Sequence, residues 1–161
     1  KVSNQIQTEK SEIEFLGSNI SSLYKEIGGN AVEWAKSKND MWNISVKYEE
    51  NMVKFTVCDL GRGIIDTLFI EKFIQLVDIM HFRDNLDILK RAFLQKYGSS
   101  SQEINRNRGL PMIKKLYDDK FISNLVVITN NVILSYDNKS YCLNNNFQFG
   151  GTYYYWEIIK K

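Results

Sequence analysis

The chain has 161 residues, 43% of them apolar and 25% charged, with a formal net charge of +2 at pH 7, as expected for a globular domain with one core. The near-neutral charge does not indicate nucleic acid or a membrane surface as a partner, and no apolar run approaches the roughly 20 residues that cross a bilayer. Two cysteines, Cys58 and Cys142, are too few for a disulfide framework and favour a reducing, cytoplasmic location.

The first half of the chain is predicted to contain a long helix and a β-hairpin. Apolar residues recur every three or four positions from 11 to 37, as in a helix that buries one face. Gly28 and Gly29 interrupt this pattern at a cost of roughly 2 kcal/mol relative to alanine, and close approach of another group to the backbone is one reason for such a cost. Residues 42–48 and 52–59 alternate apolar and polar side chains around a short turn, which predicts a hairpin.

Helices and then strands follow the hairpin. The pattern predicts helices over 67–80, 84–97 and 110–118, a polar loop over 98–108, and strands over 121–130, 131–138, 140–143 and 151–159. This order predicts an α+β fold, a two-layer α/β sandwich in which helices cover one face of a mixed, mostly antiparallel sheet. No Gly/Pro-rich linker divides residues 1–161, so we expect a single domain. Because the first residue is Lys1 and not methionine, we expect a fragment of a longer protein.

A first chemical motif is the run EIGGNAVE, which places Glu26 and Asn30 one helical turn apart on the same face. An amide oxygen is a neutral, hard ligand of the kind that Mg²⁺ accepts. A carboxylate one turn away can take a proton from a water molecule aimed at a γ-phosphate. In isolation this spacing is common on solvated helices, so the motif needs support from elsewhere in the chain.

A second motif is the run VCDLGRGI, in which an apolar strand ends at Asp59 and is followed by Gly61 and Gly63. The glycines permit backbone angles that other residues avoid and allow a ligand to approach closely. A carboxylate at this position can accept a hydrogen bond from the exocyclic amine of adenine, and in a dry pocket such a bond discriminates strongly between bases. A simple turn between a strand and a helix is the alternative interpretation.

Two further motifs lie near the third helix and the last strand. In RNRGLPMI, a helix begins next to Arg106 and Arg108, and the free N–H groups of a helix start attract phosphate; a basic helix start on a solvated loop is the alternative. In FGGTY, a tight glycine turn precedes Thr152, whose hydroxyl is able to reach a base directly or through water. For FGGTY taken alone, an ordinary turn is the more common interpretation.

The succession of these four motifs resembles that of the GHKL superfamily, which includes DNA gyrase, the heat-shock chaperone ATPase, the mismatch-repair ATPase, histidine kinases and the anti-sigma-factor kinases. EIGGNAVE resembles the N box, CDLGRGI the first glycine box, RNRGLPMI the second glycine box, and GGTYYYWEI the closing glycine–threonine motif. The resemblance spans residues 12–159 and is most specific at CDLGRGI, which is close to the gyrase form. It implies the Bergerat fold and Mg-ATP binding.

The resemblance also implies a role for each matching residue. Asn30 coordinates Mg²⁺, Glu26 orients or deprotonates the attacking nucleophile as general base, and Asp59 binds the adenine amine. The remaining nucleotide-binding residues that it implies are Gly61 and Gly63 in the adenine pocket, Arg108, Gly109 and Leu110 against the phosphates, and Thr152 beside the base. Residues 98–107 correspond to the ATP lid, and Glu33 corresponds to an acidic position that can pair with Arg62.

Some positions depart from the family pattern. Asn107 stands where the second glycine box usually has its first glycine; asparagine tolerates left-handed angles, so the departure affects lid closure, and hence hydrolysis, more than binding. Histidine kinases usually carry Asn or His at the position of Glu26 and need a phosphoacceptor histidine before the N box. No histidine precedes His81, the only one in the chain, and we expect His81 to be a surface or packing residue.

Three classes of function remain open from the sequence. The first is an ATPase or nucleotide-gated switch, in which ATP closes the lid and drives association with a protein partner or a second copy. The second is a protein kinase of the anti-sigma-factor or histidine-kinase type, which transfers the γ-phosphate to a partner protein. The third is a non-catalytic interaction module that docks through the aromatic run 153–156, although alternation along a sheet with one covered face explains that run better.

Overall fold

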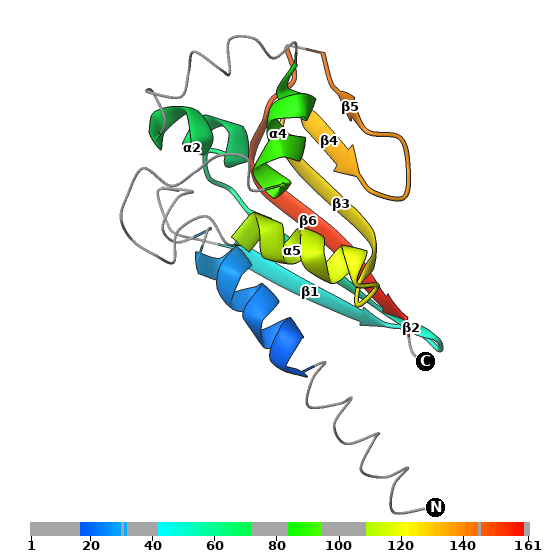
Figure 1. Cartoon of the computed structure of the whole chain (residues 1–161). Helices are drawn as coiled ribbons and strands as arrows, with labels where there is room; N and C mark the ends of the chain where they lie inside the picture. The colour runs from blue at the N-terminus through cyan, green and yellow to red at the C-terminus, as the bar shows by residue number, and fades with distance from the viewer. Residues whose placement is uncertain are drawn as a thin grey trace, which may run out of the picture.

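The computed structural model describes residues 17–29, 31, 42–71, 84–94, 109–144 and 146–159 (Figure 1). The predicted hairpin is confirmed. Strand β1 (Trp42–Tyr48) pairs with β2 (Met52–Asp59) in an antiparallel register that runs without interruption from Trp42 opposite Asp59 to Tyr48 opposite Val53. The turn between them is closed by a hydrogen bond from the Glu49 N–H to the Met52 carbonyl, 2.9 Å long. Asp59 therefore ends the strand, as the alternation predicts.

The sheet contains four more strands, β3 (Ser123–Asn130), β4 (Val132–Ser135), β5 (Tyr141–Cys142) and β6 (Phe149–Ile159). The order across the sheet is β1-β2-β6-β3-β4-β5, and every described pairing is antiparallel. The last strand of the chain thus lies between β2 and β3. This insertion places Thr152 of β6 opposite Asp59 on one side and opposite Thr129 on the other, which brings together three polar residues distant in sequence.

The described helices lie on one face of the sheet in Figure 1. They are the helix over residues 17–29, α2 (Ile64–Glu71), α4 (Asn85–Phe93) and α5 (Gly109–Asp118). The start of α4 agrees with the sequence, because Asp84 caps it by accepting a hydrogen bond from the Asp87 N–H at 2.9 Å, a typical role for aspartate. Helix α2 begins three residues earlier than the predicted start at residue 67, for a reason given below. Residues 11–16, 32–37, 72–80 and 95–97 of the predicted helices lie outside the described residues.

The hydrophobic core lies between these helices and the inner face of β2, β3 and β6. Leu23 and Ile27 of the first helix pack in the same cluster as the strand residues and α5. Phe55 of β2 and Trp156 of β6 stack with ring centres 5.4 Å apart and an angle of 5° between the planes. Tyr154 and Trp156 are buried, whereas Tyr153 and Tyr155, which alternate with them along the strand, are half-buried. The aromatic run is therefore an alternating strand of a sheet with one covered face, as the preferred interpretation predicted.

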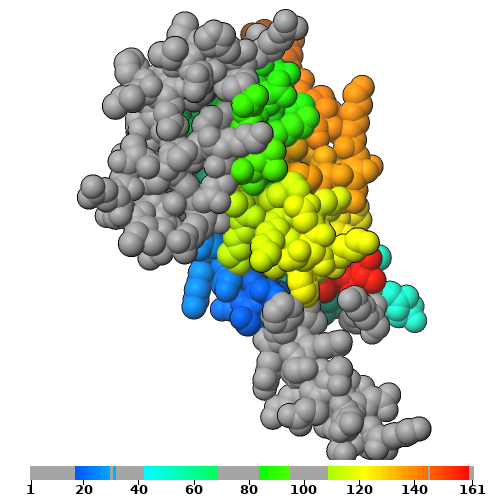
Figure 2. All heavy atoms as spheres, viewed as in Figure 1, coloured from blue at the N-terminus to red at the C-terminus, as the bar shows by residue number. Residues whose placement is uncertain are grey.

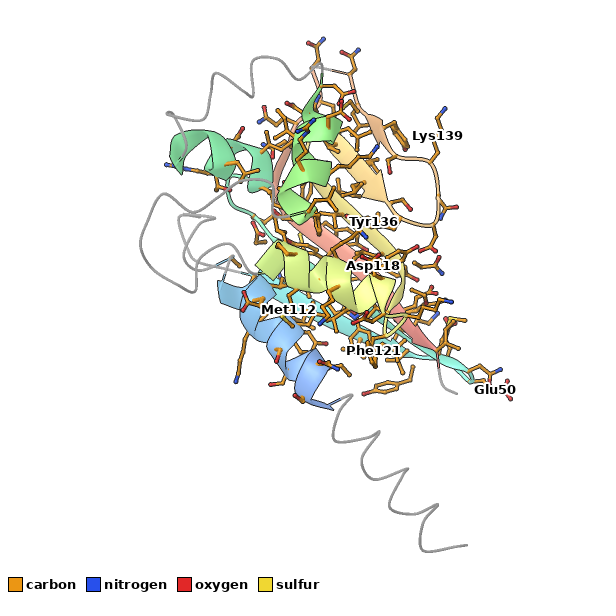
Figure 3. All side chains as sticks on the ribbon, in the orientation of Figure 1. Glu50, Met112, Asp118, Phe121, Tyr136 and Lys139 are labelled. Atoms are coloured by element: carbon orange, nitrogen blue, oxygen red, sulfur yellow. The ribbon has the colours of Figure 1, made fainter. Side chains whose placement is uncertain are left out.

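A second group of aromatic rings joins α4, α5 and the segment after β4. The ring of Tyr136 lies 6.0 Å from Phe93 and 5.0 Å from Tyr117, centre to centre. Lys114 of α5 lies 5.2 Å from the centre of the Tyr136 ring and also pairs with Asp118. Figure 3 shows Tyr136 close to Asp118 at the end of α5, and in the space-filling view α4, α5 and the β4 region form one continuous surface (Figure 2). These contacts tie the helix layer to the sheet.

Candidate functional site

Three neighbouring strands contribute polar side chains to the otherwise apolar inner layer. Asp59 of β2, Thr152 of β6 and Thr129 of β3 stand in one row across the sheet. Their exposed fractions are 8%, 4% and 0%. A buried polar group is tolerated only when it is hydrogen-bonded, so the partners of these three residues define what the site can do.

The Asp59 carboxylate is the central group of the row. Its Oδ1 accepts a hydrogen bond from the Gly61 N–H at 3.0 Å. Burial raises the pKa of Asp59 above its ordinary value, while hydrogen bonds from the Gly61 N–H and from the backbone and hydroxyl of Thr152 act in the opposite direction. An ionised carboxylate offers about four acceptor sites, more than these donors use. Asp59 is therefore a buried acceptor with capacity for a further donor.

Two glycines give the site its shape. Gly63 has a φ of +81°, and a Cβ there would lie 2.5 Å from Asn130 Oδ1 and 2.8 Å from Thr129 Oγ1. Gly151 has a φ of +121°, and a Cβ there would lie 2.0 Å from the carbonyl oxygen of Asp59. Side chains are excluded at both positions, because the left-handed angle and the close contact act together. The sequence predicted this need for Gly63 and for a tight turn before Thr152.

The end of β3 holds the turn that follows Asp59. Thr129 Oγ1 accepts a hydrogen bond from the Ile64 N–H at 2.8 Å, and Asn130 Oδ1 accepts one from the Ile65 N–H at 3.1 Å. The Asn130 side-chain amide also donates to the Arg62 carbonyl at 3.2 Å. The first N–H groups of α2 are thus satisfied by side chains from a distant strand, which is why the helix begins at Ile64 without a local capping residue. Neither Thr129 nor Asn130 belongs to a motif that the sequence indicates as part of a site.

The helix over residues 17–29 supplies the predicted general base. Leu23 and Ile27 are buried in the core, and Glu26, between them in sequence, is partly buried. Gly28 is buried, and a Cβ there would lie 3.2 Å from the Trp42 ring, whereas a Cβ at Gly29 would have no neighbour within 4 Å. Close approach of another group therefore explains Gly28 alone. Asn30, the predicted magnesium ligand, and Glu33 lie outside the described residues.

An open groove of about 770 Å³ lies along this helix, lined among others by Ile20, Tyr24, Gly28 and Trp42. No pattern in the sequence indicates this groove. Successive helical residues are rotated by about 100°, so Glu26 lies nearly opposite Gly28 around the helix. Glu26 does not line the groove, but Trp42 does, and Trp42 stands opposite Asp59 in the sheet, so one end of the groove borders the row of polar side chains.

Helix α5 begins at Gly109, the first described residue of the second glycine box. Gly109 is buried, and the partly buried Leu110 packs against the core and against Ile88 and Ala92 of α4. Figure 1 shows the start of α5, the start of α2 and the C-terminal end of the first helix toward the same end of the sheet, where β2 finishes. Arg106, Asn107, Arg108, His81 and the predicted lid over 98–107 lie outside the described residues.

No protein-family model matches the sequence, and a search of curated proteins found no match. Within the described ranges, no three His, Cys, Asp or Glu side chains gather into a group that could hold a metal ion; the predicted ligand Asn30 is not among the residues searched. None of the helices in the described part of the chain is long and apolar enough to span a bilayer. The thiols of Cys58 and Cys142 are both free.

Proposed function

We propose that this chain binds Mg-ATP as a domain of the GHKL type, a two-layer α/β sandwich with the Bergerat arrangement. The observation that carries the proposal is Asp59. It is a carboxylate buried at the end of a strand, held by the Gly61 N–H and next to a hydroxyl on the neighbouring strand, and Gly151 packs directly against its backbone carbonyl. Such a group suits the exocyclic amine of adenine, which donates the hydrogen bonds that a carboxylate accepts.

The other implied residues complete the proposed site. Thr152 stands opposite Asp59 in the sheet, where its hydroxyl can contact the base. Helix α5 starts with Gly109 and Leu110 toward the same end of the sheet, so its free N–H groups suit the phosphates, with Arg108 adding charge. The amide oxygen of Asn30 is the proposed magnesium ligand. When bound, Mg²⁺ neutralises charge that develops on the phosphates.

Glu26 is the proposed general base. Its place on the helix beside the buried Leu23 and Ile27 limits the orientations open to its carboxylate. From there it takes a proton either from water, in an ATPase, or from a hydroxyl of a partner protein, in a kinase. We propose the ATPase or nucleotide-gated switch, with lid closure over residues 98–107 and association with a protein partner or a second copy. The free thiols support a cytoplasmic location.

Titration calorimetry of the purified chain with ATP, ADP and GTP, each with and without Mg²⁺, tests the proposal. We expect saturable ATP binding that strengthens with Mg²⁺. We expect the Kd for GTP to exceed that for ATP by about tenfold or more, because O6 of guanine presents an acceptor to the Asp59 carboxylate. Heat signals that are the same for ATP and GTP, or no binding of ATP up to millimolar concentration, would contradict it.

A further inference from the structure

We propose that Thr129 and Asn130 are positioning residues that set the base specificity of the Asp59 site, although neither needs to touch the ligand. This inference rests on the proposed nucleotide function. It adds that Thr129 and Asn130 fix the orientation of the Asp59 carboxylate. Thr129 and Asn130 make three of the hydrogen bonds that hold the turn from Asp59 to Ile65, and the bond from the Gly61 N–H to Asp59 is a fourth.

Thr129 acts through its hydroxyl, which is fully buried. The oxygen accepts from the Ile64 N–H at 2.8 Å and lies 3.1 Å from the Gly151 carbonyl, to which it donates. The same oxygen lies 3.2 Å from Asn130 Oδ1, a second acceptor. A hydroxyl has one hydrogen and two lone pairs, so this hydrogen is shared between Gly151 and Asn130 and is not available to Asp59. The Thr152 hydroxyl lies 3.5 Å away and can therefore give its own hydrogen to Asp59, the stronger, charged acceptor. One hydroxyl thus orders both glycine turns and the neighbouring donor.

Asn130 holds the same turn from its other side. Its φ of 53° is left-handed, a conformation that asparagine tolerates better than most residues. From that position its amide bonds the Ile65 N–H and the Arg62 carbonyl, at 3.1 and 3.2 Å. The space that a side chain at residue 63 would need is filled by Asn130 and Thr129. The turn is thus fixed on one side by Asp59 bonding Gly61 and on the other by the end of β3.

The consequence for recognition is directional. If the turn shifts, the Asp59 carboxylate keeps its place at the end of β2 but no longer points in a single direction, so a base with a donor loses its advantage over one with an acceptor. If these residues only capped helix α2, their loss would lower the stability of the fold and weaken the binding of every nucleotide by the same factor. The ratio of affinities for two bases separates these two roles.

The test compares Thr129→Val, which keeps the shape and removes the hydroxyl, with Thr129→Ser, which keeps the hydroxyl. The probes are ATP and inosine triphosphate, whose base carries a carbonyl where adenine carries the amine. We expect the full chain to prefer ATP, Thr129→Val to reduce that preference by about tenfold, and Thr129→Ser to retain it. An unchanged preference in Thr129→Val would overturn the inference, even if binding to both nucleotides weakened equally.

A second variant covers the case in which Thr129→Val does not fold. Asn130→Gly keeps the left-handed backbone and removes the amide, and we expect the same loss of base preference; retention of the full preference would overturn the role of Asn130. If the native chain binds no nucleotide, the proposed function fails, and the positioning claim is tested by hydrogen exchange alone. The Gly61 N–H, which bonds Asp59 and not Thr129, should then exchange about tenfold faster in Thr129→Val, and an unchanged rate would refute the coupling.

Discussion

Replacing Asp59 with asparagine separates the function of this residue from its effect on stability. The change is isosteric and leaves an oxygen that can still accept from the Gly61 N–H, which lies 3.0 Å from Oδ1 in the native chain. What is lost is the negative charge that we propose recognises the adenine amine. A hydrogen bond to a charged group contributes about 1.5–3 kcal/mol, so the Kd for ATP should rise by roughly 10- to 150-fold.

The same substitution should make the unliganded fold more stable at neutral pH. Burial raises the pKa of Asp59 above its ordinary value of 3.8, so the folded chain holds this proton more tightly than the unfolded chain does. Well below pH 3.8 the carboxyl is protonated in both states and the destabilisation disappears. Between pH 3.8 and the raised folded-state pKa the unfolded chain releases its proton first, so the destabilisation grows, and above the folded-state pKa it stays constant. Asp59→Asn removes this term, so its gain in the free energy of unfolding should grow from pH 4 toward pH 7.

Urea unfolding of the native and substituted chains at several pH values, together with ATP titration at pH 7, measures both effects. The expected pattern is a variant that is more stable at pH 7, no more stable near pH 3.8, and weaker in ATP binding. If the native and substituted chains differed in the free energy of unfolding by the same amount at both pH values, burial would not destabilise the ionised form of Asp59. An unchanged Kd for ATP in a folded variant would refute its role in recognition.

Other substitutions test the remaining parts of the site. Gly63→Ala should lower the free energy of unfolding, measured by urea titration, by about 3 kcal/mol or more, because the new Cβ would lie 2.5 Å from Asn130 Oδ1 at a φ of +81°. Gly29→Ala is the matched control, because a Cβ there has no neighbour within 4 Å. In the same titration it should be neutral or stabilising by up to about 1 kcal/mol. Glu26→Ala should abolish steady phosphate release in a coupled assay while ATP still binds, and persistent release would rule out its role as general base. Asn30→Ala should remove the effect of Mg²⁺ on ATP affinity; a titration with and without chelator that still differs as in the native chain would contradict this.

Local patterns in the sequence were sufficient to predict the hairpin and the position of Asp59. The alternation in β1 and β2, with a short polar turn between them, leaves one register that buries Phe55 and Val57, and period-two patterning determines both faces. The buried and half-buried residues of β6 follow from the same rule. The strand order does not, because nothing local to β6 specifies that it inserts between β2 and β3.

The parts of the site that the sequence did not reveal depend on contacts between distant residues. Helix α2 begins at Ile64 because its first N–H groups bond side chains 65 residues away, so no capping residue stands before it in sequence. In the sequence, Thr129 and Asn130 have the pattern of a strand end before a turn. Only the folded structure shows that they face Gly63. Gly28 gave a correct local signal, but its partner, the Trp42 ring, is identified only in three dimensions.

Two-dimensional NMR of the isotope-labelled chain, recorded during a titration with Mg-ATP, shows whether a purine nucleotide binds at the end of β2. Saturating Mg-ATP should shift the amide signals of residues 59–65 and 151–152, and that of Trp42 opposite Asp59, and leave those of Gly17 and Ser21 near the start of the first helix unchanged. Shifts confined to Gly17, Ser21 and the groove face of the first helix, with the signals of Asp59 and Gly61 unmoved, would contradict recognition by Asp59.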